Sequence, residues 1–472
     1  MTRQSLLVWY SITGLETSDR AGRSRICNRG GWIHMCTPNT LTRAIGLALF
    51  IASANAAAAD FDYSLRAGID HSDNINLSDT QPISQNVLVP GVNFSFQQQG
   101  SVLQANVAGN VEYRDYLGNA FDSQTLAQLG GQANWTVLPQ RLDFTVLDYA
   151  GIQPLSTLST NVPNNQQQTN VLALGPTLQF RLGDTLRGEA DLRYTNTYAA
   201  KTKQFDSSRG TAALRVIKDL SPTAHLSANI DTERVTFQDI SGGPSYARSE
   251  VFGRYVSQLS HVDLDASAGW SRINFSGMPD STSPLLRLRL AWRATPENTF
   301  AIAAARQISD SAQDLIDQTG QVAAIGPVVA PIQPNIDVGS AVISSGVYIE
   351  RRIEASYSFA GARLTFVLAP LYNKLSYINY STPNQTGRGG RAGLDYRLTE
   401  QSTLSAFANT ANVHYTSLNR TDRTTNYGVG VTSRRTQHWS VTLSVSHGLR
   451  SSTEPGQGYQ VNEIYLGFIY RR

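Results

Sequence analysis

Apolar and charged side chains alternate with unusual regularity between Leu285 and Arg293. The apolar set is Leu286, Leu288, Leu290 and Trp292. The charged set is Arg287, Arg289 and Arg293. Because successive side chains of a strand point to opposite sides, this pattern predicts a strand with one apolar and one charged face. Such a strand fits a soluble sandwich that buries the apolar face, or a transmembrane barrel that turns it to lipid.

The same alternation recurs along the chain, as in Leu103–Tyr113, Leu186–Tyr194, Val262–Trp270 and Trp439–Val445. Aromatic residues lie near the ends of the apolar faces, as the interfacial girdles of membrane barrels require. Short turn signals separate pairs of strands at intervals of about 40 residues, with longer polar stretches between them. The turns are Gln99-Gly100, Pro139-Gln140, Gly183-Asp184, Ser221-Pro222, Ser260-His261, Pro296-Glu297, Ala360-Gly361, Glu400-Gln401 and Gln437-His438.

Tight turns that alternate with long loops are typical of an up-and-down antiparallel meander. The sequence therefore predicts an all-β transmembrane barrel of about 18–20 strands, with short periplasmic turns and long extracellular loops. A soluble sandwich seldom has so many long strands, and a barrel this wide leaves an aqueous channel. No run of about 18 apolar residues exists, which excludes a bundle of membrane helices. We expect the barrel to lie in the outer membrane of a Gram-negative bacterium, in contact with its lipid.

The N-terminal part of the chain lacks this rhythm. Residues 1–34 show no periodicity, and Met35 opens a secretory signal with Arg43, a short apolar core and the cleavage site Ala54-Asn55-Ala56. We therefore expect an N-terminal extension that is not native over residues 1–34, a signal peptide over 35–58 and the barrel over 59–472. An unusually long signal n-region is the alternative. Cys27 and Cys36, the two cysteines, precede the cleavage site, so the mature chain offers no thiol chemistry.

Two loops stand out, and the second falls in the one long interval between turns, the 64 residues from Pro296 to Ala360. Gly151–Thr169 is rich in Pro, Ser, Asn and Gln, which predicts an ordinary surface loop. Ser309–Ser345 is long and has an apolar centre, which is unlike a loop that extends into water. We expect it to fold inward as a constriction or to pack over the mouth, and a loop ordered only by crystal or lipid contacts is the alternative. The residues that would form the constriction are Ile325, Pro327, Val328, Val329 and Pro331.

Two local sequences suggest a family. The last strand, Ile464–Tyr470, resembles the terminal strand of outer-membrane barrels, although Arg471 and Arg472 follow its final aromatic residue. The segment Gly68–Leu77, GIDHSDNINL, resembles the opening motif of the β-barrel porin family that occurs beside exopolysaccharide operons and exosortase systems. That resemblance implies a role in the passage or export of a surface polysaccharide, together with periplasmic export components. A general diffusion porin and a structural anchor for an export complex are the alternatives.

Charge defines the candidate site. With 39 basic and 36 acidic residues, the chain lacks the basic excess of a nucleic-acid-binding protein. The alternation places many arginines toward the lumen, where they can form cross-strand ion pairs or guide an anionic or hydroxyl-rich glycan. The permeation candidates are Arg187, Arg193, Arg287, Arg289, Arg293, Arg352, Arg391 and Arg397. We expect no cofactor, metal site or enzymatic activity: His71 beside Asp73 is the best local pair, and it lies at a loop edge without a placed nucleophile.

Overall fold

The computed structural model describes residues 59–239, 243–316, 343–378 and 382–472. The chain divides into two compact units, Met1–Asn55 and Ala56–Arg472, and all described residues belong to the second unit. The predicted extension and signal peptide therefore lie outside the described residues.

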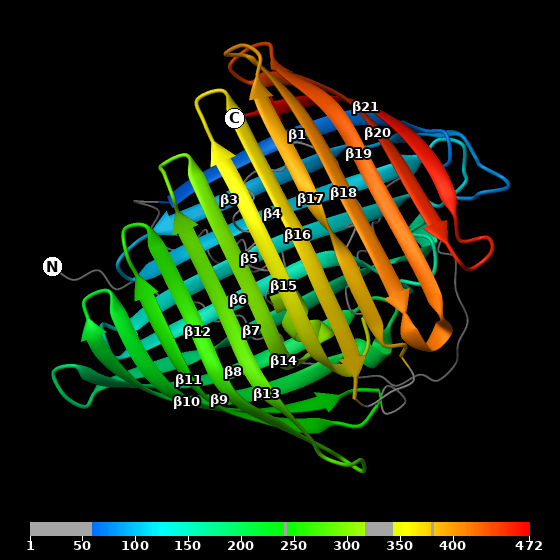
Figure 1. The fold of residues 1–472 in the computed structure, drawn as a ribbon. Coiled ribbons are helices and arrows are strands. Elements are labelled where there is room, and N and C mark those ends of the chain that lie inside the picture. The colour runs from blue at the N-terminus through cyan, green and yellow to red at the C-terminus, as the bar shows by residue number, and fades with distance from the viewer. Residues whose placement is uncertain (1–58, 240–242, 317–342, 379–381) are drawn as a thin grey trace, which may run out of the picture. The chain divides into compact units, whose positions relative to one another are not determined.

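The described residues form one closed antiparallel barrel (Figure 1). Its first half comprises β1 (Ala59–Ser72), β2 (Gln85–Leu88), β3 (Gly91–Gln99), β4 (Leu103–Tyr116), β5 (Gln124–Leu138), β6 (Leu142–Pro154), β7 (Gln166–Arg181), β8 (Leu186–Ala199), β9 (Ser207–Ser221), β10 (Ala224–Phe237) and β11 (Tyr246–Gln258). Its second half comprises β12 (Val262–Phe275), β13 (Ser281–Arg293), β14 (Asn298–Asp310), β15 (Val347–Ala360), β16 (Leu364–Tyr377), β17 (Gln385–Arg397), β18 (Ser402–Tyr415), β19 (Arg420–Arg434), β20 (Trp439–Ser452) and β21 (Tyr459–Arg471).

The strands β2 and β3 are two parts of one interrupted strand, because both lie between β1 and β4. Val89 and Pro90 separate them, and proline lacks the backbone N–H that a continuous ladder needs. With these two counted as one, 20 strands of the described chain go round the barrel. The barrel closes where β1 pairs with β21, from Ser64 opposite Arg471 to Ser72 opposite Glu463. The predicted fold class and strand number are confirmed.

The predicted turns lie at one end of the barrel, between consecutive strands from β3/β4 to β19/β20. The other end carries the longer connections and the short helical segments η1 (Pro163–Asn165), η2 (Lys203–Phe205), η4 (Thr416–Leu418) and an α-helical stretch over residues 311–316. None of the described helices is long and apolar enough to cross a membrane.

The apolar side chains that alternate with polar ones in the sequence lie on the outer face of the barrel wall. Trp135, Trp270, Trp292 and Trp439 are exposed on its outer face, where aromatic rings anchor a barrel at the membrane interface. On β13, Leu286 and Leu288 also face outward and are exposed. In a closed barrel the backbone N–H and C=O groups of each strand are paired with a neighbouring strand, and the apolar outer face suits lipid. The chain is therefore an outer-membrane β-barrel.

Candidate functional site: the lumen and its mouth

The arginines predicted on β13 lie on its lumen face, opposite the exposed leucines. Arg287 donates to Gln307 Oε1 at 2.6 Å and to Glu250 Oε2 at 3.0 Å. Arg293 forms a two-bond pair with Asp263 near the periplasmic turn. In the described part of the chain Arg289 has no hydrogen-bonded or ion-paired partner. Two of the three arginines are thus neutralised by the wall.

The other predicted arginines divide in the same way. Arg187 lies 3.4 Å from Asp219, Arg193 lies 3.3 Å from Asp191, and Arg352 lies 2.9 Å from Glu354. Arg391 and Arg397 on β17 point inward. No carboxylate of the described residues lies within ion-pair distance of either. Among the eight predicted arginines, Arg289, Arg391 and Arg397 have no ion-pair partner in the described residues, so these candidates can act on a permeating ion or glycan.

The extracellular end of β14 leaves the wall and turns into the lumen. Its pairing with β13 stops at Leu286 opposite Arg306, while its pairing with β15 continues to Asp310 opposite Val347. Pro284 lies on β13 just beyond the last residue paired with β14. Because proline has no backbone N–H, it cannot donate the hydrogen bond that would continue this pairing. Pro284 is a local sequence feature that marks this departure.

A buried charge cluster holds the departed end of β14. Asp310 accepts a hydrogen bond from Arg209 on β9 at 2.6 Å and another from the Tyr246 hydroxyl on β11. Arg209 also lies 3.9 Å from Glu233. The Arg209 and Asp310 side chains are each less than 5% exposed, so the pair is isolated from solvent. Sequence reasoning missed this cluster because its members are far apart in the chain.

The helical residues 311–316 follow Asp310 and cross to a different part of the wall. Ala312 and Leu315 form an apolar cluster with Ile343, Tyr149, Val171, Ala199 and Phe205. Those last four belong to β6, β7, β8 and η2, which do not neighbour β14 or β15 in the sheet. The ends of the Ser309–Ser345 loop therefore fold inward. Its predicted constriction residues, Ile325, Pro327, Val328, Val329 and Pro331, lie outside the described residues, so the constriction itself stays a prediction.

The connection between β6 and β7 is a second inward segment, and it crosses the mouth of the barrel toward β19 and β20. Arg450 donates to Ser159 O at 2.8 Å, and Arg420 donates to Leu158 O. Asp422 binds both arginines, at 2.9 Å and 2.8 Å. These arginines come from β19 and β20, far from β6 and β7 in the sheet order. The expectation that Gly151–Thr169 is an ordinary surface loop is wrong, because its carbonyl oxygens are held by the far wall.

In the described structure His71 and Asp73 have separate hydrogen-bond partners. His71 Nδ1 lies 2.8 Å from Asn86 Oδ1, while Asp73 accepts both N–H groups of Asn462 at 2.7 Å. Partial burial would raise the pKa of Asp73, but the Asn462 donors outweigh it and lower that pKa below its ordinary value. Asp73 thus fastens the first long loop to β21. The described residues also contain no cluster of His, Cys, Asp and Glu that could hold a metal.

Comparison with known proteins shows no family for this chain. No protein-family model matches the chain, and no curated protein matches it. It is similar to the FrpB iron transporter of Neisseria meningitidis, F5-1 variant, at 10% identity and TM-score 0.45, over 88% of this chain and 83% of that one. It is also similar to a mutant of the ferric enterobactin receptor PfeA of Pseudomonas aeruginosa, at 12% identity and TM-score 0.45, over 88% and 80% of the two chains. Likeness at this level leaves the function open.

Proposed function

We propose that the chain is a gated outer-membrane channel through which a polysaccharide passes. A 20-stranded barrel is wide enough for an aqueous channel. The Gly68–Leu77 segment supports the glycan assignment through its resemblance to the exopolysaccharide-associated porin family. Hydroxyl, amide, guanidinium and carboxylate groups line the inner wall, and the arginines among them that have no carboxylate partner suit a hydroxyl-rich or anionic polymer. Periplasmic export components are the proposed partners.

The crossed mouth is the observation that carries the proposal. A permanently open barrel of this width would leak small solutes, so a channel for a polymer needs a closed resting state. The β6–β7 connection is held by hydrogen bonds from Arg420 and Arg450 to backbone carbonyl oxygens. Arginine binds carboxylates more strongly than neutral carbonyls. An acidic glycan that arrives from the lumen can therefore replace the loop at these two arginines and open the channel.

The paired arginines of the lumen favour a second candidate, a general diffusion porin. Most inward arginines are matched by a carboxylate on their own strand or one or two strands away, which gives a rigid wall with little preference for one solute. In that case the inward loops would narrow the channel without closing it. A structural anchor for an export complex would have no conducting state at all.

Single-channel recording distinguishes the three. We expect the native barrel to be mostly closed and the Arg420→Ala/Arg450→Ala variant to conduct, because the β6–β7 connection loses its anchor. An anionic oligosaccharide added to the open variant should block its current. Arg423→Ala is the matched control, since Arg423 lies on β19 but is exposed on the outer face.

Each other outcome identifies an alternative. Equal steady conductance of the native and variant barrels, together with free passage of small sugars, would indicate a diffusion porin. A folded variant that never conducts would indicate a structural anchor. An open variant that anionic oligosaccharides do not block would contradict the glycan assignment.

A further inference from the structure

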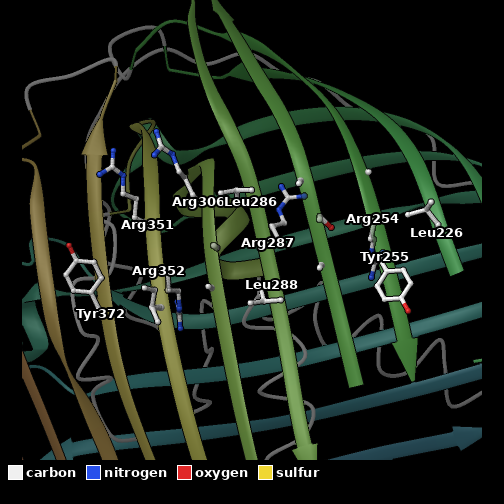
Figure 2. Close-up of a pocket in the computed structure, with 17 residues that line it drawn as sticks. Leu226, Arg254, Tyr255, Leu286, Arg287, Leu288, Arg306, Arg351, Arg352 and Tyr372 are labelled. Carbon is white, nitrogen blue, oxygen red and sulfur yellow. The ribbon is translucent and has the colours of Figure 1, made fainter. Parts of the chain in front are cut away.

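The outer wall carries a groove that the channel does not explain. It has a volume of about 760 Å³ and extends across the wall from Leu226 on β10 to Tyr372 on β16. Its floor is made of small residues, Gly253, Ala266, Ala268 and Ala304. Figure 2 shows Leu286 and Leu288 in its middle, with Arg306 and Arg351 side by side toward one end.

The groove faces lipid. Leu226, Leu286 and Ile353 line it and are about half exposed on the outer face. Residues directly opposite each other in neighbouring strands share a face. Ala268 lies opposite Leu286, and Ala304 lies opposite both Leu288 and Ile353. The small residues thus leave a hollow in an otherwise leucine-rich outer surface.

The same register places a row of cations on this lipid-facing side. Arg306 lies opposite both Leu286 and Arg351, and Arg351 lies opposite Lys374. On the next strand Arg388 lies opposite Tyr372, with its guanidinium 5.9 Å from the centre of that ring. Four cations on β14 to β17 therefore share one outer patch.

These cations lack counter-ions within the protein. In residues 59–239, 243–316, 343–378 and 382–472, no acidic side chain lies within ion-pair distance of Arg306, Arg351 or Lys374. The adjacent inward arginines differ, since Arg287 and Arg352 each have a glutamate partner. Like charges directly opposite each other destabilise a sheet, and cations on the lipid face are costly away from the interface. A row of this kind implies an anion supplied from outside.

The groove runs obliquely across the membrane. Its row of paired positions starts at Leu226, near the periplasmic end of β10, and reaches Arg388, near the extracellular end of β17. The cations are therefore at the extracellular side, and the apolar floor descends from them into the membrane. From Leu226 on β10 to Tyr372 on β16 the groove is about 29 Å long, at about 4.8 Å for each of the six steps between strands.

From this arrangement we propose that the groove binds lipid A of the outer leaflet. Its phosphates contact Arg306, Arg351 and Lys374, and one acyl chain lies over Gly253, Ala268 and Ala304. Lipid A is the phosphorylated, multiply acylated lipid of that leaflet, so it presents phosphate at the height of the cations. Phosphatidylglycerol offers one phosphate and belongs mainly to the opposite leaflet. The site is independent of what passes through the lumen.

Native mass spectrometry of the purified full-length barrel tests the proposal. The probes are bis-phosphorylated lipid A, its monophosphoryl form and phosphatidylglycerol. We expect the bis-phosphorylated lipid to bind best. Arg306→Gln/Arg351→Gln should weaken it about tenfold or more, since each cation near a membrane surface contributes about one factor of five. Ala304→Trp should also weaken the binding of lipid A, because the indole ring fills the groove while every cation stays in place.

The control is Arg234→Gln, because Arg234 is an exposed cation on β10 outside the groove. It should bind lipid A like the parent. Unheated mobility on a detergent gel confirms that each variant is folded. Equal binding of phosphatidylglycerol and lipid A by the parent would overturn the proposal without any variant. So would parent-like binding by the folded Arg306→Gln/Arg351→Gln barrel.

Discussion

At the scale of single residues, burial separates the ion pairs that hold the mouth from those that line the wall. Arg209 and Asp310 are almost fully buried and lie 2.6 Å apart. Arg187 and Asp219 are each about 40% exposed and lie 3.4 Å apart. Removing one partner of a buried pair leaves a desolvated charge and costs about 3–5 kcal/mol, whereas an exposed pair contributes about 0–1 kcal/mol.

This difference predicts the effect of Asp310→Asn. Among the described residues, Glu233, 3.9 Å away, would be the remaining ion-pair partner of Arg209. We expect the end of β14 to detach, with the local opening free energy of residues 311–316 lowered by about 3 kcal/mol. Hydrogen exchange of the backbone amides of residues 311–316 measures this opening free energy. Asp219→Asn is the control, and a similar effect from both changes would show that the Arg209–Asp310 pair does not hold the loop.

At the scale of elements, the sequence predicted the wall but not its inward segments. Period-two alternation is a local property, so strands such as Leu285–Arg293 could be predicted from their own residues. The position of the β6–β7 connection depends on contacts such as Arg450 with Ser159, which are 291 residues apart. No local pattern encodes such a contact. For the same reason, sequence alone could place the lumen arginines on the inner face but could not tell Arg287 from the unpaired Arg289.

The pairing of β1 with β21, the seam that closes the barrel, contains two facing glycines. Gly68 on β1 lies opposite Gly467 on β21, and glycines weaken a strand. The Tyr465 ring covers this pair: a Cβ at Gly68 would lie 2.5 Å from the ring, and one at Gly467 would lie 2.2 Å from its hydroxyl. A tyrosine packed over paired glycines compensates for their missing side chains. The seam thus depends on the absence of a Cβ at both positions.

We therefore expect Gly68→Val to displace the Tyr465 ring and weaken barrel closure by about 1–3 kcal/mol. The measurement is the urea midpoint of the fast-migrating folded form on unheated gels. Gly393→Val on β17 is the matched control, because a Cβ there would meet nothing within 4 Å. Equal midpoints for the two variants would mean that the glycine pair is not needed for closure.

At the scale of the whole molecule, two inward segments and an incompletely neutralised wall share one lumen. The paired arginines contribute little net field, because each has a carboxylate within a few ångströms. The unpaired Arg289 comes from β13, and Arg391 and Arg397 come from β17. Charged groups without partners set the ion preference of a channel. The selectivity of the open barrel should therefore follow these three residues.

Charge reversal in the open Arg420→Ala/Arg450→Ala barrel tests this expectation. We expect Arg289→Glu/Arg391→Glu/Arg397→Glu to change the reversal potential in a salt gradient toward cation preference, because three positive charges become negative in an aqueous lumen. The shift should shrink at high salt, where the Debye length falls to about 3 Å at 1 M. Arg187→Gln/Asp219→Asn is the control, since it removes a matched pair without changing net charge. An unchanged reversal potential in the conducting triple variant would mean that permeating ions do not approach these arginines and that selectivity is set elsewhere in the lumen.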